Sequence, residues 1–176
     1  DDIREVIEYA AERHITVIPE IEFPGHSREV FAAYPELCCA GEAYKSNVFC
    51  AGNEAVYIFM DKVLNEVMDL FPSEIIHIGG DETNTQHWQK CPKCQMLMKE
   101  ENMQDEHELH KYIIRKAEEI ITTRGRRLAG WDEIGDEKLD KTSVITSWRG
   151  DKAGIDAIRQ GYDVVFAPLH YLYLDY

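Results

Sequence analysis

Short β-rich runs alternate with longer amphipathic stretches along this sequence, and this alternation restricts the possible folds more than any other feature. The runs that predict strands are residues 15–21, 75–78, 127–131, 144–148 and 163–167. Helical periodicity is found at residues 54–70, 107–123 and 152–160, in a shorter stretch at 88–100, and in the first ten residues. Strands that alternate with helices predict an α/β fold with a parallel sheet and helices outside it.

Each predicted strand leads directly into residues suited to chemistry. The segments concerned are PEIEFPGH, HIGGDE, AGWDE, TSWRG and HYLYLD. In a (β/α)₈ barrel all such loops emerge at one face and share one site, whereas an open doubly wound sheet offers mainly the crevice where its strand order reverses. The five segments therefore favour part of a TIM barrel. The sequence contains neither GxGxxG nor GxxxxGK[ST], so the common nucleotide-binding loops are excluded.

The charge balance favours a neutral ligand. The chain has 33 acidic against 19 basic residues, a net charge of -14, and its densest basic run, residues 124–127, is short. Nucleic-acid binding needs clustered cations, so no nucleic-acid partner is expected. No apolar run approaches the roughly 18 residues that a membrane helix needs, and the first ten residues lack a signal-peptide pattern.

The five cysteines leave their role open. An odd count means that at least one thiol is unpaired within the chain. CPKC resembles half of a structural zinc site, but no second CxxC or close HxxxH pair completes four ligands, so no metal is expected. Local disulfides and free thiols are the alternatives. We expect Cys39 and Cys50 to lie close enough for a disulfide that tethers the loop after FPGH, which mildly favours an oxidising compartment.

HIGGDE is the most informative segment. Two glycines at the end of a strand allow a tight turn, and Asp81 and Glu82 follow them. Two adjacent carboxylates in a partly dry site titrate as a pair, so that one is ionised while the other keeps its proton, which suits acid catalysis. An exposed pair that caps the next helix is the alternative.

Aromatic rings collect at the same strand ends. Trp131 and Trp148 each end a predicted strand, and Tyr171, Tyr173 and Tyr176 follow another. A pyranose packs its apolar face on such rings while its hydroxyls seek polar groups, although any single ring could equally belong to the core or rim. His26 ends FPGH and could orient a catalytic acid, or be an ordinary loop residue.

IPEIEFPGH, HIGGDE, AGWDE, TSWRG and YLD, in that order and at this spacing, resemble the motif series of glycoside hydrolase family 20, the β-N-acetylhexosaminidases. The resemblance covers nearly the whole chain and implies that residues 1–176 form one partial catalytic barrel. It implies a retaining hydrolase whose substrate supplies its own 2-acetamido group as the nucleophile. Glu82 would be the general acid and later the base, and Asp81 would orient and stabilise the acetamido group through an oxazolinium intermediate.

The resemblance also implies substrate-binding roles for five residues, which are His26, Trp131, Trp148, Tyr173 and Asp175. His26 would support the catalytic glutamate, and the two tryptophans would wall the acetamido pocket. Tyr173 would hydrogen-bond the acetamido oxygen, and Asp175 would bind sugar hydroxyls. No metal or organic cofactor is implied.

This chain corresponds to about strands three to seven of the family's barrel, which has further strands before and after them. The first strand of the family carries a substrate-binding arginine, and Arg149 does not match it. The expected partners are glycans that end in β-linked N-acetylglucosamine or N-acetylgalactosamine, and open barrel edges could support self-association. A non-catalytic carbohydrate-binding or inactive barrel fragment is the alternative. The expected location is secreted, periplasmic or at the cell surface, with any export signal outside this chain.

Overall fold

The computed structural model describes residues 2–174 and contains a four-stranded parallel sheet. The strands are β1 (Ile75–His77), β2 (Arg127–Trp131), β3 (Val144–Ser147) and β4 (Asp163–Phe166). Their spatial order is β1-β2-β3-β4, so each strand pairs with its neighbour in the sequence. This confirms the predicted α/β fold, and the sheet is part of a (β/α)₈ barrel.

Helices occupy most of the connections between strands. They are α1 (Asp2–Ala11), α2 (Val30–Ala33), α3 (Glu54–Leu70), α4 (Gln86–Lys90), α5 (Pro92–Glu100), α6 (Glu106–Thr123), α7 (Asp151–Arg159) and α8 (Leu169–Leu172), with 3₁₀ turns η1 (Pro35–Leu37) and η2 (Asp132–Ile134). The two long central helices begin at side-chain caps, because Asn53 accepts from the Ala55 amide and Asp105 accepts from the Glu108 amide.

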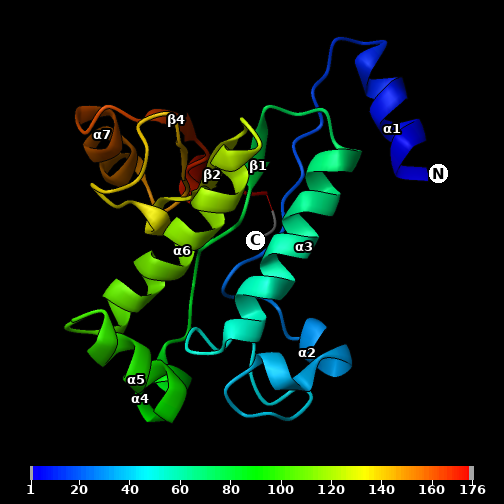
Figure 1. Cartoon of the computed structure of the whole chain (residues 1–176). Helices are drawn as coiled ribbons and strands as arrows, with labels where there is room; N and C mark the ends of the chain where they lie inside the picture. The colour runs from blue at the N-terminus through cyan, green and yellow to red at the C-terminus, as the bar shows by residue number, and fades with distance from the viewer. Residues whose placement is uncertain (1, 175–176) are drawn as a thin grey trace.

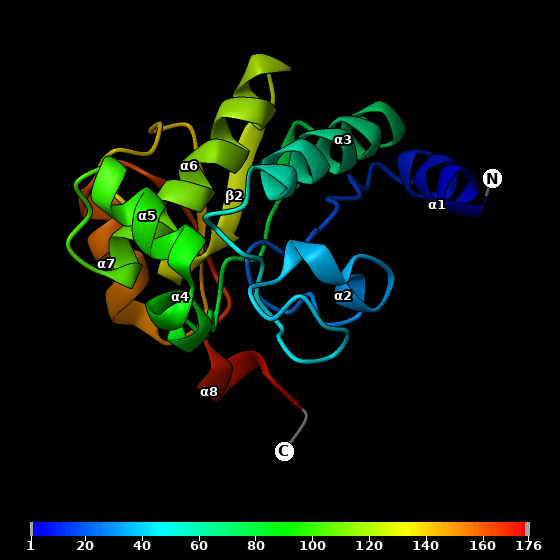
Figure 2. The ribbon, with the colours of Figure 1, turned by 60° about the horizontal axis from the view of Figure 1, so that its bottom comes forward.

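Helices α3, α6 and α7 form a layer on one face of the sheet. Figure 1 shows α7, α6 and α3 following one another across the view in the same order as the strands behind them. In both Figure 1 and Figure 2, α2 lies at the same end of the molecule as α4 and α5. This is the end toward which β1 points, so these short helices belong to the loops that follow the strands.

The core lies between the sheet and the helices α3 and α6. Its buried apolar side chains include Val56, Met60, Leu64, Leu109, Ile113, Ile114, Ile76, Leu128 and Ile145. Burial of such side chains is the main stabilising contribution to the fold. The first helix contributes little, because Ile3 and Val6 are 49% and 58% exposed and Ala10 is its buried residue.

A second group of aromatic side chains holds the loop that follows residue 23. The Phe49 ring stacks on Phe23 with their centroids 4.8 Å apart and meets the edge of Phe31 at 5.0 Å. The Phe49 amide also donates to the carbonyl of Pro24, which follows a cis peptide bond. These contacts fix the FPGH turn against the core.

The prediction of a strand at residues 15–21 is wrong. The segment is extended beside β1 but pairs with it at one parallel bridge, between Glu20 and His77. Hydrogen bonds join the Pro19 carbonyl to the His77 amide and the Ile21 amide to the His77 carbonyl. Pro19 has no N–H to donate, and within residues 2–174 no strand pairs with the other edge of this segment, so a ladder does not form.

The amphipathic stretch at residues 88–100 is two helices rather than one. The break falls at Cys91, whose backbone is extended at φ -83° and ψ 116°, and Pro92 starts α5 at its first position. Proline disfavours helical backbone in the residue before it, which explains the break. The strand predictions 144–148 and 163–167 each extend one residue too far, and 75–78 ends at His77. No helix within residues 2–174 is long and apolar enough to cross a membrane.

The prediction of a disulfide between Cys39 and Cys50 is also wrong. All five cysteines are free, and the Cys39 sulfur lies instead 3.7 Å from that of Cys94. The CPKC pair reaches across to both cysteines of the earlier loop, so the argument that no second pair completes its four ligands fails.

Candidate active site

The carboxyl ends of the strands bring the predicted segments together at one edge of the sheet. Backbone pairing continues past the strand ends, because the Trp131 amide donates to the Gly79 carbonyl at 2.8 Å and the Phe23 amide to Ile78 at 2.9 Å. The segments FPGH, GGDE and GWDE are therefore held in register beside one another. Parallel strands place such loops on one face, as the sequence predicted.

The GGDE turn depends on its two glycines. Gly79 and Gly80 have φ of 66° and 94°, a region that other residues rarely adopt. A Cβ on Gly79 would lie 1.9 Å from a carboxylate oxygen of Glu22, and one on Gly80 would lie 2.3 Å from the Ile134 side chain. A side chain at either position would overlap these atoms, so the turn requires glycine at both positions.

A buried histidine supports this turn from α6. The Nε2 atom of His110 lies 2.9 Å from the Gly80 carbonyl, and burial lowers the pKa of His110 to about 4. The ring is therefore neutral near pH 7 and donates its Nε2–H to that carbonyl. The sequence pattern predicts no role for His110, but its contact with the Gly80 carbonyl supports the turn.

His26, Asp81 and Glu82 form a compact group in front of the turn. The His26 Nε2 atom lies 3.3 Å from Asp81 Oδ2 and 3.5 Å from Glu82 Oε2. Asp81 is the sheltered member, with a side chain 17% exposed, whereas that of Glu82 is 57% exposed. Glu82 has φ 46°, which directs the chain out of the turn immediately after Asp81. The structure thus brings together the three residues that the sequence analysis took from two separate segments.

A third carboxyl group, Glu22, lies behind Asp81. Burial, followed by the charges of Asp81 and Glu20, raises the pKa of Glu22 to about 8. Glu22 Oε2 and Asp81 Oδ1 are both buried without a hydrogen-bond partner. Near neutral pH the Glu22 carboxyl group keeps its proton and is uncharged, so no second full negative charge lies beside Asp81.

Glu20 links the first segment to the Trp131 ring. Its Oε1 accepts a hydrogen bond from Trp131 Nε1 at 2.9 Å and lies 3.2 Å from Nδ1 of His77. The hydrogen bond from His77, reinforced by the one from Trp131, lowers the pKa of Glu20. The Trp131 ring also meets the edge of the His77 ring, 5.2 Å between centroids. Trp131 is therefore fixed in orientation at the end of β2.

Trp148 follows β3 and is held by the two carboxylates of η2. Its Nε1 donates to Glu133 at 3.1 Å, and its amide donates to the buried Asp132 at 3.1 Å. Asp132 also accepts from the Arg149 guanidinium at 2.5 Å. Burial raises the pKa of Glu133, partly opposed by the Trp148 hydrogen bond and the Arg149 charge.

Asp132, Glu133 and Arg149 help to line a hollow of about 520 Å³ next to Glu82. Its lining includes Glu82, Thr83, His107, Asp132, Glu133 and Arg149. A volume of this size accommodates a small polar molecule. Arg149, which matches no binding residue of the family resemblance, therefore places a positive charge in the lining of the hollow that Glu82 also lines.

The predicted residues after β4 are less fully described. Tyr173 follows α8 and is partly buried, and its amide donates to the Leu169 carbonyl. Tyr171 is 74% exposed, so its ring is not part of the core. Asp175 and Tyr176 lie outside the described residues.

Besides His110, two carboxyl groups of the site were missed, those of Glu20 and Glu22. They alternate with Ile21 and Phe23 in the PEIEF segment, so they share one face of extended chain while the apolar residues share the other. That period-two pattern was the signal for both, and it was available in the sequence.

Two groups of side chains meet the distances of a cation site among the described residues. One is His26, Asp81 and Glu82, and the other is Cys39, Cys50, Cys91 and Cys94. In the first group His26 and Glu82 are exposed, and contacts of 3.3 and 3.5 Å between the imidazole and the two carboxylates hold the group together. The second group has three buried members.

Comparison with known proteins places these features in a family. The sequence profile of glycosyl hydrolase family 20, catalytic domain, matches residues 1–176. A β-hexosaminidase of Porphyromonas gingivalis is 42% identical over all of this chain and 24% of its own length. One of Vibrio furnissii is 45% identical over 99% of this chain and 30% of its own length. The chain thus spans less than a third of the length of these two relatives.

Solved structures give the same result. An exo-β-N-acetylglucosaminidase of Vibrio harveyi in complex with N-acetylglucosamine superposes with a TM-score of 0.90 at 38% identity, over 98% of this chain and 29% of that one. A variant of the Vibrio harveyi enzyme with one aspartate replaced by alanine is inactive. A β-N-acetylhexosaminidase of Bacteroides fragilis superposes with a TM-score of 0.86 at 38% identity, over 93% of this chain and 35% of that one.

Proposed function

This chain belongs to the catalytic domain of glycosyl hydrolase family 20, and we propose that it forms the acid-bearing part of the active site of a β-N-acetylhexosaminidase. The observation that carries the proposal is the group of His26, Asp81 and Glu82, whose polar atoms all lie within 4.8 Å of one another at the carboxyl edge of the sheet. The proposed reaction removes terminal β-linked N-acetylglucosamine or N-acetylgalactosamine from glycans.

Glu82 is the proposed general acid and base. Its exposed carboxyl group stands clear of the turn, where it could reach the glycosidic oxygen of a sugar bound in front of the sheet. It protonates that oxygen as the bond breaks and later takes a proton from the attacking water. His26, 3.5 Å away, holds the carboxyl group in position.

Asp81 is the proposed partner of the substrate's acetamido group. As the acetamido oxygen attacks the anomeric carbon, positive charge develops on the oxazolinium ring, and a fixed neighbouring carboxylate stabilises it. Asp81 suits this role because it is sheltered from water and held by His26 through one oxygen. Protonated Glu22 behind it adds no competing charge.

Trp131 is the proposed stacking surface for the sugar. Its indole is oriented by Glu20 and His77, so little conformational freedom is lost when a pyranose packs on it. Trp148 and Tyr173 stay proposed members of the same pocket on the strength of the resemblance, as does Asp175.

The test is hydrolysis by the complete protein that carries this chain, compared with its Glu82→Gln variant. On substrates with poor leaving groups the variant should lose about 10²–10⁴-fold in kcat, because these substrates depend most on protonation. On aryl glycosides with strongly electron-withdrawing leaving groups the loss should be much smaller. Glu66→Gln, at an exposed position on α3, is the matched control and should leave both rates unchanged.

Equal losses on both substrate types would contradict the acid role. If the unaltered protein bound N-acetylglucosamine but hydrolysed neither substrate, the non-catalytic alternative would replace the proposal.

A further inference from the structure

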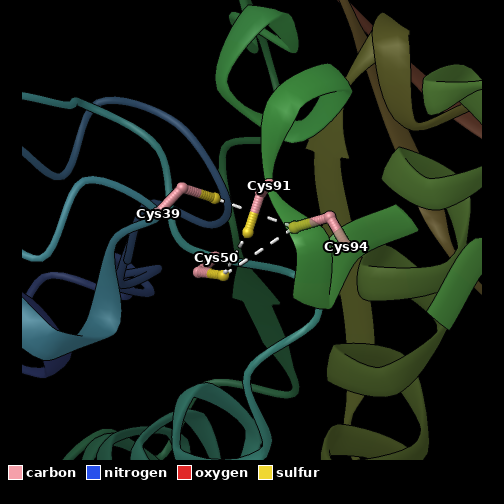
Figure 3. Close-up of side chains that lie close together, drawn as sticks. All are labelled: Cys39, Cys50, Cys91 and Cys94. Atoms are coloured by element: carbon pink, nitrogen blue, oxygen red, sulfur yellow. Dashed lines mark hydrogen bonds between the residues drawn. The ribbon is translucent and has the colours of Figure 1, made fainter. Parts of the chain in front are cut away.

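Four cysteine sulfurs from two distant segments converge on one point. Cys39 and Cys50 lie in the loop between the FPGH turn and α3, and Cys91 and Cys94 lie at the start of α5. Figure 3 shows the four side chains pointing toward a common centre. All four sulfurs lie within 4.8 Å of one another, and Cys50, Cys91 and Cys94 are buried.

The distances between the sulfurs fit a tetrahedral metal site. The sulfur of Cys94 lies 3.7 Å from those of Cys39 and Cys50, and the sulfurs of Cys50 and Cys91 are 3.6 Å apart. Zinc–thiolate bonds of about 2.3 Å at tetrahedral angles place neighbouring sulfurs about 3.8 Å apart. We therefore propose that Cys39, Cys50, Cys91 and Cys94 bind one structural Zn²⁺ ion.

The same geometry argues against disulfides. A disulfide brings two sulfurs to about 2.05 Å and singles out one partner for each cysteine. Here Cys50 is almost equally distant from Cys91 and Cys94. Because no pair stands apart from the others, the arrangement is that of four ligands around a centre.

The surroundings of the sulfurs suit bound thiolates. The Gly52 amide lies 3.4 Å from the Cys94 sulfur, and backbone N–H groups of this kind commonly support ligands from outside the metal's own coordination shell. Cys91 caps α5 and Cys94 lies in its first turn, where the helix dipole favours negative charge. Cys39 is half-buried beside a surface hollow of about 550 Å³ lined by Cys50, Cys91 and Lys93, which gives the ion a path of entry.

A zinc ion here would join the two loops that carry the acid pair and its histidine. The loop with Cys39 and Cys50 also holds Phe49, whose amide donates to Pro24 and whose carbonyl accepts from Trp88 Nε1. The metal would therefore brace the FPGH turn against the segment after GGDE. This inference does not depend on the reaction proposed above, because its ligands are outside the acid group.

The decisive measurement is metal content by plasma mass spectrometry on the complete protein, purified under reducing conditions without chelator. We expect about one zinc ion per chain at this site. Cys39→Ser and Cys94→Ser should each lose that equivalent, and their thermal midpoints should fall by about 5 °C or more.

Cys38→Ser is the matched control. Cys38 adjoins Cys39 and is buried, but its sulfur donates to the carbonyls of Pro35 and Glu42, so a serine can keep the donor and the zinc should stay. Gly52→Ala tests the site without changing a ligand. Its Cβ would lie 2.2 Å from the Lys93 carbonyl carbon, so the loop must move off α5 and the zinc content should drop.

Cobalt exchanged into the unaltered protein should give the intense visible absorption of a tetrahedral thiolate site, a result that does not depend on any variant folding. Zinc-free protein with five titratable thiols, or equimolar iron in place of zinc, would overturn the proposal, and so would a mass showing two disulfides in protein purified without reductant.

Discussion

Replacing Glu22 with glutamine should change how the stability of the protein depends on pH. In the folded protein the pKa of Glu22 is about 8, against 4.5 for an ordinary glutamate, because of burial and the nearby charges of Asp81 and Glu20. Between those two values the folded chain keeps a proton that the unfolded chain gives up. The contribution of Glu22 to stability is therefore complete below pH 4.5 and is lost as the pH rises through about 8.

The size of the effect follows from the difference between the pKa of Glu22 in the folded protein and that of an ordinary glutamate. If no water reached the carboxyl group, the difference would correspond to about 5 kcal/mol. Glu22 is only partly buried, so solvent screens part of this, and we expect about 2 kcal/mol between pH 5 and pH 9. In a chain of 150–250 residues that free energy would correspond to about 5 °C in thermal midpoint, and in a protein several times longer to about 2 °C or less.

The assay is the thermal midpoint of the complete protein and of Glu22→Gln, measured every half unit from pH 5 to pH 9. The variant cannot ionise at this position, so the difference between its thermal midpoint and that of the unaltered protein should change in favour of the variant by about 2 °C from pH 5 to pH 9. Glu66→Gln on α3 serves as the control for removal of one exposed negative charge. Profiles for Glu22→Gln that run parallel to the unaltered protein would refute the reasoning.

Three further predictions concern the site. Asp81→Asn should lower kcat at least about 100-fold with little change in KM, because the charge that it stabilises exists only along the reaction; a rise in KM alone would contradict this. Trp131→Ala should raise KM up to about tenfold by removing the stacking surface, and an unchanged KM would show that the sugar does not use this ring. Gly80→Ala should cost about 2–4 kcal/mol of stability, since φ is 94° and its Cβ would meet Ile134; denaturant midpoints that match the unaltered protein would disprove this.

The sequence predicted those elements whose signals are local. The helix at residues 54–70 was placed at its observed ends, because its apolar period is regular and Asn53 caps it. Four of the five strands were found to within a residue. The fifth, at residues 15–21, has the apolar pattern of a strand, but the number of hydrogen bonds it makes depends on its neighbours rather than on its own residues.

Features that depend on distant segments were harder to predict. His26 and the acid pair were selected one by one, and their approach within 3.3–3.5 Å depends on the pairing of two segments beyond the end of β1. The cysteine group was missed because its ligands come as one short-spaced pair and one pair eleven residues apart, a spacing that no common zinc pattern has. His110 carried no signal, since a histidine within a helix is more often an ordinary surface or core residue than one that supports a distant turn.

The order of strands in the sheet, β1-β2-β3-β4, is also the order in which a ribosome produces them. Each strand can therefore dock on the one made just before it, without waiting for a distant partner. The residues that support the turn carrying Asp81 and Glu82 are also synthesised after it. First α6 supplies His110, which contacts the Gly80 carbonyl, and then the residues after β2 supply Ile134, which packs against Gly80. A nascent chain halted just after η2 would already hold His26, Asp81 and Glu82 on a braced turn, whereas the Trp148 side of the site would be added only by later synthesis.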